Sequence, residues 1–85
     1  MKSNYRKAFN ELKKLGAPVY IHPDDKERFD ISAEEPKSDR WLSYYSDIRP
    51  SDWNFGINPI IDEILTKHDL YCEWVNPAHV RVYDL

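Results

Sequence analysis

The chain has 85 residues, of which 15 are acidic and 12 are basic, so its formal charge is -3. This length accommodates one modest hydrophobic core and predicts a single domain over residues 1–85. No apolar run approaches the roughly 18 residues that span a bilayer, and the charged N-terminal stretch is unlike a signal peptide. We therefore expect a soluble cytoplasmic protein.

The composition excludes several kinds of site. Cys72 is the only cysteine, which excludes an intrachain disulfide and favours a reducing compartment. The two glycines, Gly16 and Gly56, are too few for a glycine-rich phosphate loop. Aromatic residues make up 14% of the chain, far more than a disordered chain carries, so we expect the chain to fold.

A first helix is predicted over residues 4–15. Ser3 or Asn4 can cap its start, and Gly16 followed by Pro18 ends it. Its apolar positions recur at helical spacing and form one stripe: Tyr5, Ala8, Phe9, Leu12 and Leu15.

Two short strands are predicted next, at 19–22 and 28–33, joined as a hairpin by the turn residues 23–25. Both alternate in polarity. The inward positions are Val19, Ile21, Phe29, Ile31 and Ala33, and the outward ones are Tyr20, His22, Arg28, Asp30 and Ser32. A competing interpretation has Asp24 and Glu27 form a capping box for one helical turn.

The middle of the chain is ambiguous. In residues 40–46, Trp41, Tyr45 and the following Ile48 would line one face of a helix. The aromatic content and short length favour a strand antiparallel to 28–33 instead. Residues 48–54 are expected to form an irregular loop.

A second helix is predicted over residues 58–68, because Asn58 can cap it and Pro59 suits its first position. Asp62 and Glu63 near the start and Lys67 and His68 at the end agree with the helix dipole. Its buried stripe is expected to contain Ile60, Ile61, Ile64 and Leu65.

The C-terminal segment predicts a β-hairpin, 70–75 with 79–84, around a three-residue loop at 76–78. This register pairs Val75 with His79, whereas a two-residue loop would misalign the faces. One face is expected in the core, with Leu70, Cys72, Trp74, Val80 and Val82. The other carries an opposite-charge pair and an aromatic pair directly across the strands, Glu73 with Arg81 and Tyr71 with Tyr83.

Together these elements predict an α+β fold. Its mainly antiparallel sheet has four or five strands, and both helices pack on one face. The expected core contains Phe9, Leu12, Val19, Ile21, Phe29, Ile31, Ile61, Ile64, Leu65, Cys72, Trp74, Val80 and Val82.

The sequence contains no catalytic signature, so we expect a non-enzyme without metal or cofactor. Cys72 falls on the expected core face, where a thiol acts as a small hydrophobe. His22, His68 and His79 are not at ligand spacing from one another, and each has a structural explanation in a strand end, a helix end or a turn.

The element order is similar to that of a winged helix, with 58–68 as recognition helix and 76–78 as wing. This resemblance implies nucleic-acid binding, the alternative hypothesis. Asp62 and Glu63 would repel phosphates, and the wing has no basic residue at its tip. The mixed, acidic charge also offers no surface for generic phosphate binding.

The leading hypothesis is a protein-protein interaction module. Tyrosine and arginine are favoured at binding hot spots, and the outer face of the terminal hairpin is expected to present both. It would bind another protein or a second copy of this chain, and cross-strand packing on a solvated face is the simpler interpretation. Small acidic adaptors and inhibitors of this type are typical of viruses and mobile elements. The candidate residues are Tyr71, Glu73, His79, Arg81 and Tyr83, with Tyr20 and His22 expected nearby.

Overall fold

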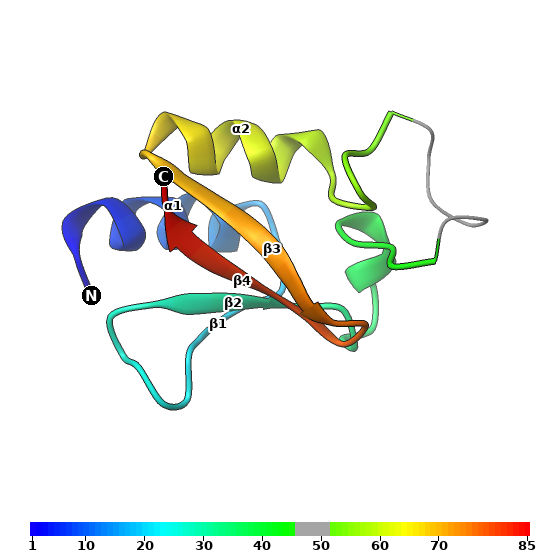
Figure 1. Ribbon diagram of the computed structural model, residues 1–85, viewed down its shortest axis with the longest axis horizontal. Coiled ribbons are helices and arrows are strands. Elements are labelled where there is room, and N and C mark those ends of the chain that lie inside the picture. Colours follow the sequence, from blue (N-terminus) through cyan, green and yellow to red (C-terminus); the bar gives the residue numbers. More distant parts are fainter. Residues whose placement is uncertain (46–51) are drawn as a thin grey trace.

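The computed structural model describes residues 1–45 and 52–85. Its elements are α1 (Ser3–Lys14), β1 (Val19–Ile21), β2 (Phe29–Ser32), the 3₁₀ helix η1 (Ser38–Arg40), α2 (Pro59–Lys67), β3 (Leu70–Asn76) and β4 (His79–Asp84). The four strands form one antiparallel sheet in the order β1-β2-β4-β3. Both helices lie on the same side of it (Figure 1), which confirms the α+β prediction.

Helix α1 ends as predicted but begins differently. Gly16 adopts a left-handed conformation, and the N–H groups of Gly16 and Ala17 donate to the carbonyls of Lys13 and Leu12. This pair of bonds is the usual glycine-dependent helix end. The capping prediction is wrong, because Lys2 precedes the helix and makes no side-chain cap. The Asn4 amide instead donates to the His68 carbonyl at 3.2 Å, which ties α1 to the end of α2.

The predicted hairpin of β1 and β2 is confirmed, but its burial pattern is not. All four residues of β2 are buried because the strand lies inside the sheet, with β1 and β4 on either side. Ile21 is 51% exposed and is not part of the core, since β1 is a three-residue strand at the sheet edge. The capping-box interpretation is also wrong: residues 23–27 form turns, and the Asp25 carboxylate accepts the Glu27 N–H.

The strand predicted at 40–46 is wrong over its described residues. Ser38–Arg40 form η1, and among the described residues 41–45 only Leu42 makes an isolated bridge, to Ile57. The place beside β2 belongs to β4. Trp41 and Leu42 are buried, so the apolar content of this segment contributes to the core without entering the sheet. The loop predicted at 48–54 lies largely outside the described residues, as does Ser46.

Helix α2 confirms the predicted start. The Asn58 side chain accepts the N–H of Ile60 at 2.9 Å, and Pro59 is the first helical residue. Ile61, Ile64 and Leu65 are buried. Ile60 is 44% exposed, so its predicted burial is wrong. It sits in the first turn, one position off the buried stripe.

The terminal hairpin keeps the predicted register from Tyr71–Tyr83 to Trp74–Val80. Its turn differs, because Asn76 rather than Val75 pairs with His79. The loop therefore has two residues, 77 and 78, so the prediction of a three-residue loop is wrong. The register also shifts between Trp74 and Asn76. The extra residue in β3 restores the alternation, so both faces keep their predicted members.

The core lies between the sheet and the helices. Eight predicted core residues are buried, and four more pack against the core half-buried: Phe9, Val19, Cys72 and Trp74. Tyr5, Ala8 and Leu70, which belong to the apolar faces predicted for their elements, are buried as well. The prediction left out four buried hydrophobic residues: Ala17, Trp41, Leu42 and Ile57. None of the helices in the described part of the chain is long and apolar enough to cross a membrane.

Candidate functional site

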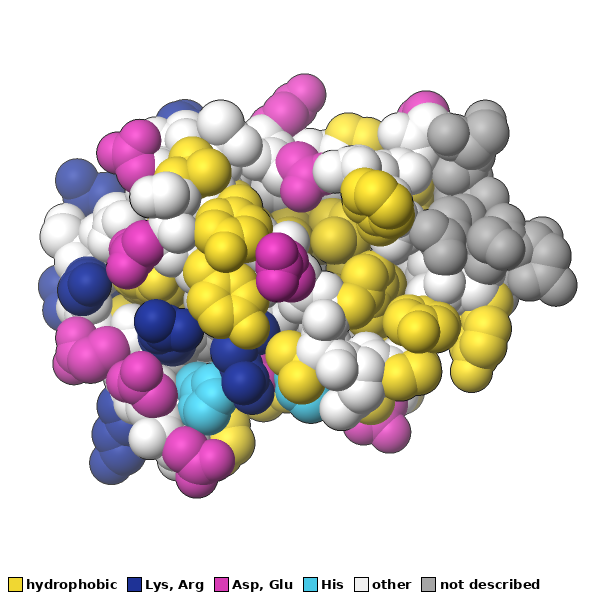
Figure 2. Space-filling view, in the orientation of Figure 1, with side chains coloured by type: hydrophobic (Ala, Val, Ile, Leu, Met, Phe, Trp, Pro, Cys, Tyr) yellow, Lys and Arg dark blue, Asp and Glu magenta, His cyan; other side chains and the backbone are white. Residues whose placement is uncertain are grey.

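The side of the sheet opposite the helices, which we call the open face, presents side chains from all four strands. Its central row crosses the sheet in the order Tyr20, Asp30, Arg81 and Glu73. A second row joins Arg28 to Tyr83 and Tyr71. In Figure 2, large hydrophobic side chains gather over β3 and β4, with Lys or Arg and His side chains directly below them.

Asp30 is the centre of this face and is only 1% exposed. The Arg81 guanidinium donates to both of its carboxylate oxygens, Nε at 3.1 Å and Nη2 at 3.3 Å. The Tyr20 hydroxyl lies 3.5 Å from Oδ2, and the His79 Nε2 lies 3.7 Å from the same oxygen. A carboxylate on the outer side of the sheet is thus covered and neutralised by side chains of the neighbouring strands.

The predicted partner of Arg81 was Glu73, and the ladder geometry explains why Asp30 takes that place. In an antiparallel ladder, pairs that exchange backbone hydrogen bonds alternate with pairs that do not, and the side chains of the second type are closer. The Ala33 N–H donates to the Ala78 carbonyl, so that pair is of the first type. Three positions along the ladder, Asp30 and Arg81 are of the second type. On the other side of β4, Glu73 and Arg81 form the wider, hydrogen-bonded type of pair. Arg81 therefore reaches Asp30 more closely than Glu73.

The charge states of this group follow from the same contacts. The hydrogen bonds to Asp30 raise the pKa of Arg81, because they stabilise the charged guanidinium. Burial, reinforced by the negative charge of Asp30, raises the pKa of Tyr20. At neutral pH the open face therefore carries a charged Arg81 and a neutral Tyr20 hydroxyl.

The two tyrosines of the hairpin form the aromatic part of the open face. The rings of Tyr71 and Tyr83 stack with centroids 5.5 Å apart and planes 30° apart, as the aromatic-pair prediction requires. The Arg28 guanidinium lies 5.4 Å from the Tyr83 ring centroid, within cation–π range. The Arg28 Nε is also 3.6 Å from the Asp25 carboxylate.

All five candidate residues lie on the open face: Tyr71, Glu73, His79, Arg81 and Tyr83. Tyr20 joins them, but His22 does not, because its buried ring accepts the Asp24 N–H through Nδ1 and serves the turn. Arg28 and Asp30 were not among the candidates. Their outward positions in 28–33 were visible in the alternation, but the pairing of that strand with β4 was not.

A second charged cluster joins the two helices. The Glu11 carboxylate lies 2.7 Å from Lys67 Nζ and 2.8 Å from His68 Nε2. The hydrogen bond from Lys67, followed by that from His68, lowers the pKa of Glu11. These three side chains satisfy one another and connect α1 to α2, which is a structural role.

The chemistry of a nucleophile or a metal centre finds little support in the described residues. Burial raises the pKa of the Cys72 thiol to about 12, which keeps it protonated at neutral pH. The described residues contain no group of three potential metal ligands.

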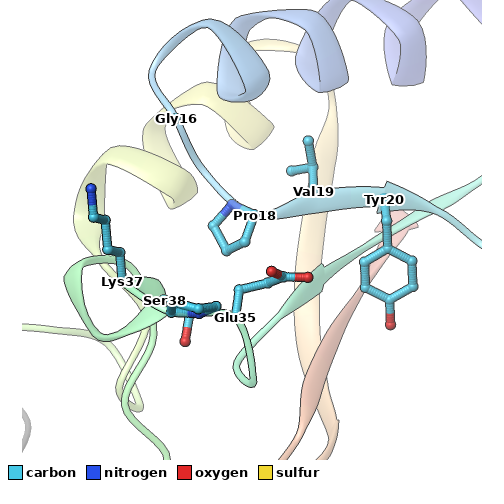
Figure 3. A pocket seen from close by; sticks show the side chains of 8 residues that line it. Gly16, Pro18, Val19, Tyr20, Glu35, Lys37 and Ser38 are labelled. Carbon is cyan, nitrogen blue, oxygen red and sulfur yellow. The ribbon is translucent and has the colours of Figure 1, made fainter.

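The cavity in Figure 3, about 330 Å³, lies between β1 and the segment before η1. Glu35 and Lys37 contribute its charged side chains, and Figure 3 shows Lys37 directed away from the Glu35 carboxylate. The remaining lining residues are Gly16, Pro18, Val19, Tyr20, Pro36 and Ser38. This cavity gathers no set of side chains with a recognisable chemistry.

No family model matches this chain, and comparisons with curated proteins and with solved structures found no similar protein.

Proposed function

We propose that this protein is a non-enzymatic interaction module, an adaptor or inhibitor, whose open face binds another protein. The observation that carries the proposal is the preordered pair of features on that face. One is the Tyr71–Tyr83 stack, and the other is Arg81 held by the buried carboxylate of Asp30. Because Cys72 is the only cysteine, the proposal includes a reducing compartment such as the cytoplasm.

Preordering matters because a binding surface loses side-chain freedom when a partner docks. Tyr71 and Tyr83 already restrict one another, and two hydrogen bonds hold Arg81. Much of the ordering cost is thus met during folding and does not reduce the binding energy. Tyrosine and arginine are also the residues that most often carry binding energy at protein interfaces.

The charges of the open face favour a protein over a nucleic acid. Arg28 lies near the Asp25 carboxylate and Arg81 near Asp30, so each cation is already paired with an anion. A phosphate backbone would have to compete with both carboxylates. A protein partner with mixed polar and aromatic groups would not.

The proposal predicts that replacing both tyrosines, Tyr71→Ser with Tyr83→Ser, abolishes partner binding while the fold remains. Loss of a hot-spot residue lowers affinity by about thirtyfold or more, so the captured partner should disappear from a quantitative pull-down. The extract comes from the organism that encodes the chain, and circular dichroism checks the fold.

Tyr45→Ser is the matched control, because Tyr45 is an exposed tyrosine whose ring contacts Tyr44 and not the Tyr71–Tyr83 stack, and it should retain the partner. An identical set of captured proteins for the double variant and the control contradicts the proposal. Sedimentation of the purified chain identifies a second copy as the partner if the double variant alone becomes monomeric.

Nucleic-acid binding through α2 and the terminal hairpin is the second candidate. The first turn of α2 carries Asp62, and the hairpin turn at 76–78 contains no cation. Gel shifts at low salt with duplex and single-stranded probes separate the candidates, and binding to neither probe removes this one.

A further inference from the structure

A groove of about 290 Å³ runs beside β3, on the side away from β4. We call it the β3 groove. Strand β3, the segment before α2 and α2 itself all contribute to its lining. Its lining residues are Asn54, Phe55, Ile57, Asp62, Tyr71, Cys72, Glu73 and Trp74.

The backbone of β3 is available for pairing along this groove. Among the residues that the structure describes, β3 is the last strand of the sheet and pairs with β4 alone. Successive residues of a strand direct their N–H and C=O groups to opposite sides. The Asp69 carbonyl accepts the Leu85 N–H on the β4 side, so the backbone groups of Cys72 and Trp74 point to the other side, toward the groove. None of the backbone hydrogen bonds found outside the ladders in the described residues uses these groups. A strand edge of this kind is a template for another strand.

The wall opposite the strand is aromatic and fixed in place. The Trp74 indole N–H donates to the Phe55 carbonyl at 2.8 Å, which attaches the segment before α2 to β3. The Phe55 ring is not covered by this contact and remains 75% exposed. An apolar side chain of a bound strand could pack against it.

Two carboxylates flank the groove, Asp62 from α2 and Glu73 from β3. Neither forms an ion pair with any cation among the described residues. Asp62 is half-buried, and burial raises its pKa, with a hydrogen bond from Asn54 acting in the opposite sense. A half-buried carboxylate without a cation is costly, and a cation from a ligand would offset that cost.

We propose that the β3 groove binds an extended peptide segment of a partner protein, which adds a strand to β3 and places a Lys or Arg side chain between Asp62 and Glu73. The charges disfavour a second copy as the occupant, because antiparallel pairing of two β3 strands about Glu73 would bring the acidic groups of both copies together. The β3 groove shares Tyr71 and Glu73 with the open face, but it follows the free edge of β3 and includes neither Tyr83 nor Arg81. It therefore goes beyond the function proposed above.

The first test is an NMR titration of the isotope-labelled chain with a capped peptide of seven residues, the length of β3. The peptide alternates threonine and valine and has one central lysine. We expect saturable shifts confined to the amides of 54–57, 61–63 and 70–76, the segments that line the groove. Replacing the lysine by glutamate should weaken binding by about tenfold or more, because a charge-assisted bond becomes a repulsion.

Substitutions in the chain test the cation contact. Asp62→Asn should weaken the lysine peptide about tenfold and leave a norleucine peptide unchanged. Glu63→Gln is the matched control, because Glu63 lies next to Asp62 in α2 but outside the groove, and it should change neither peptide. Tyr83→Ser should also leave peptide binding intact, which separates this site from the open face.

Strand addition is tested by N-methylation of the peptide. Two peptides are compared, one methylated on the odd-numbered amides and the other on the even-numbered amides. Only every second amide of a bound strand faces β3, so one of the two peptides should lose binding and the other should keep it. Equal effects in both peptides overturn the proposal. So does the absence of saturable shifts up to about 5 mM peptide, or concentration-dependent shifts of β3 without peptide, which would identify a second copy as the occupant.

Discussion

Asp30 illustrates how the environment of a single residue departs from its local pattern. Alternation in 28–33 placed its side chain outward, and the structure agrees, yet the residue is 1% exposed. Arg81, Tyr20 and His79 reach it from the strands on either side. A side chain on the outer face of a sheet is exposed to water only when the side chains on the adjacent strands are too short to cover it. Here the long side chains of the adjacent strands cover the Asp30 carboxylate.

At this scale we predict that Arg81→Ala destabilises the protein more than Asp30→Asn. The first change leaves a buried carboxylate without its guanidinium, which costs about 2–3 kcal/mol after allowance for the partly exposed arginine. The second leaves a neutral amide that can still accept one bond, and costs about 1–2 kcal/mol. Urea unfolding at neutral pH measures both.

The double variant completes the comparison. Because the two side chains interact directly, its destabilisation should be smaller than the sum of the single effects. An Arg81→Ala variant within about 0.5 kcal/mol of the parent protein would show that water replaces the arginine without cost.

At the scale of elements, a shorter turn and an extra residue in β3 compensate for one another in the terminal hairpin. The alternation of β3 and β4 correctly assigned the two faces, although the turn has two residues rather than three. The additional residue lies in β3 as an irregularity near Val75. Side-chain alternation alone cannot locate that residue, because a longer turn and a bulge produce the same faces.

The contact between α1 and α2 predicts a pH dependence of stability. The pKa of Glu11 is lowered from its ordinary value of 4.5 by Lys67 and His68. A carboxyl with a lowered folded pKa stabilises the protein above the unfolded pKa, and this contribution is lost as the pH falls through the folded value. Stability should therefore fall in the acid range, below about pH 5.

Glu11→Gln tests this contact, because glutamine keeps the shape but does not titrate. Urea unfolding at pH 7, 5 and 3 should show lower stability of the variant at pH 7 and a shallower loss toward pH 3. Glu63→Gln, which removes an exposed carboxylate outside this contact, should retain the parent slope. Parallel curves for the parent and Glu11→Gln would assign the acid sensitivity to other carboxyls.

At the scale of the whole molecule, packing of Cys72 against the single core predicts that its thiol reacts slowly while the protein is folded. Its pKa is about 12 instead of 9.0, so the thiolate fraction at neutral pH is about a thousandfold smaller in the folded protein. Labelling with iodoacetamide at pH 8 should therefore be slow in buffer and rapid in denaturing urea. Equally fast labelling in both would mean that the β3 region opens without global unfolding.

The elements that the sequence specified correctly depend on interactions within a few residues. Gly16 ends α1, Asn58 begins α2, and alternation defines the two faces of the terminal hairpin. Caps, turn residues and periodicity act locally, so they can be read from a short stretch. Five residues of the open face were found in this way, and they came from that hairpin alone.

The tertiary structure alone decided which segments meet. Beside β2 lies β4, not residues 40–46, and the Arg81–Asp30 pair joins residues 51 positions apart. The β3 groove likewise combines β3 with the segment before α2 and with α2 itself. Local patterns do not specify such partners, because strand pairing depends on how all the apolar surfaces of the chain are buried together. The sequence by itself therefore determined the elements and their faces, and the packing of the whole chain determined the sites between them.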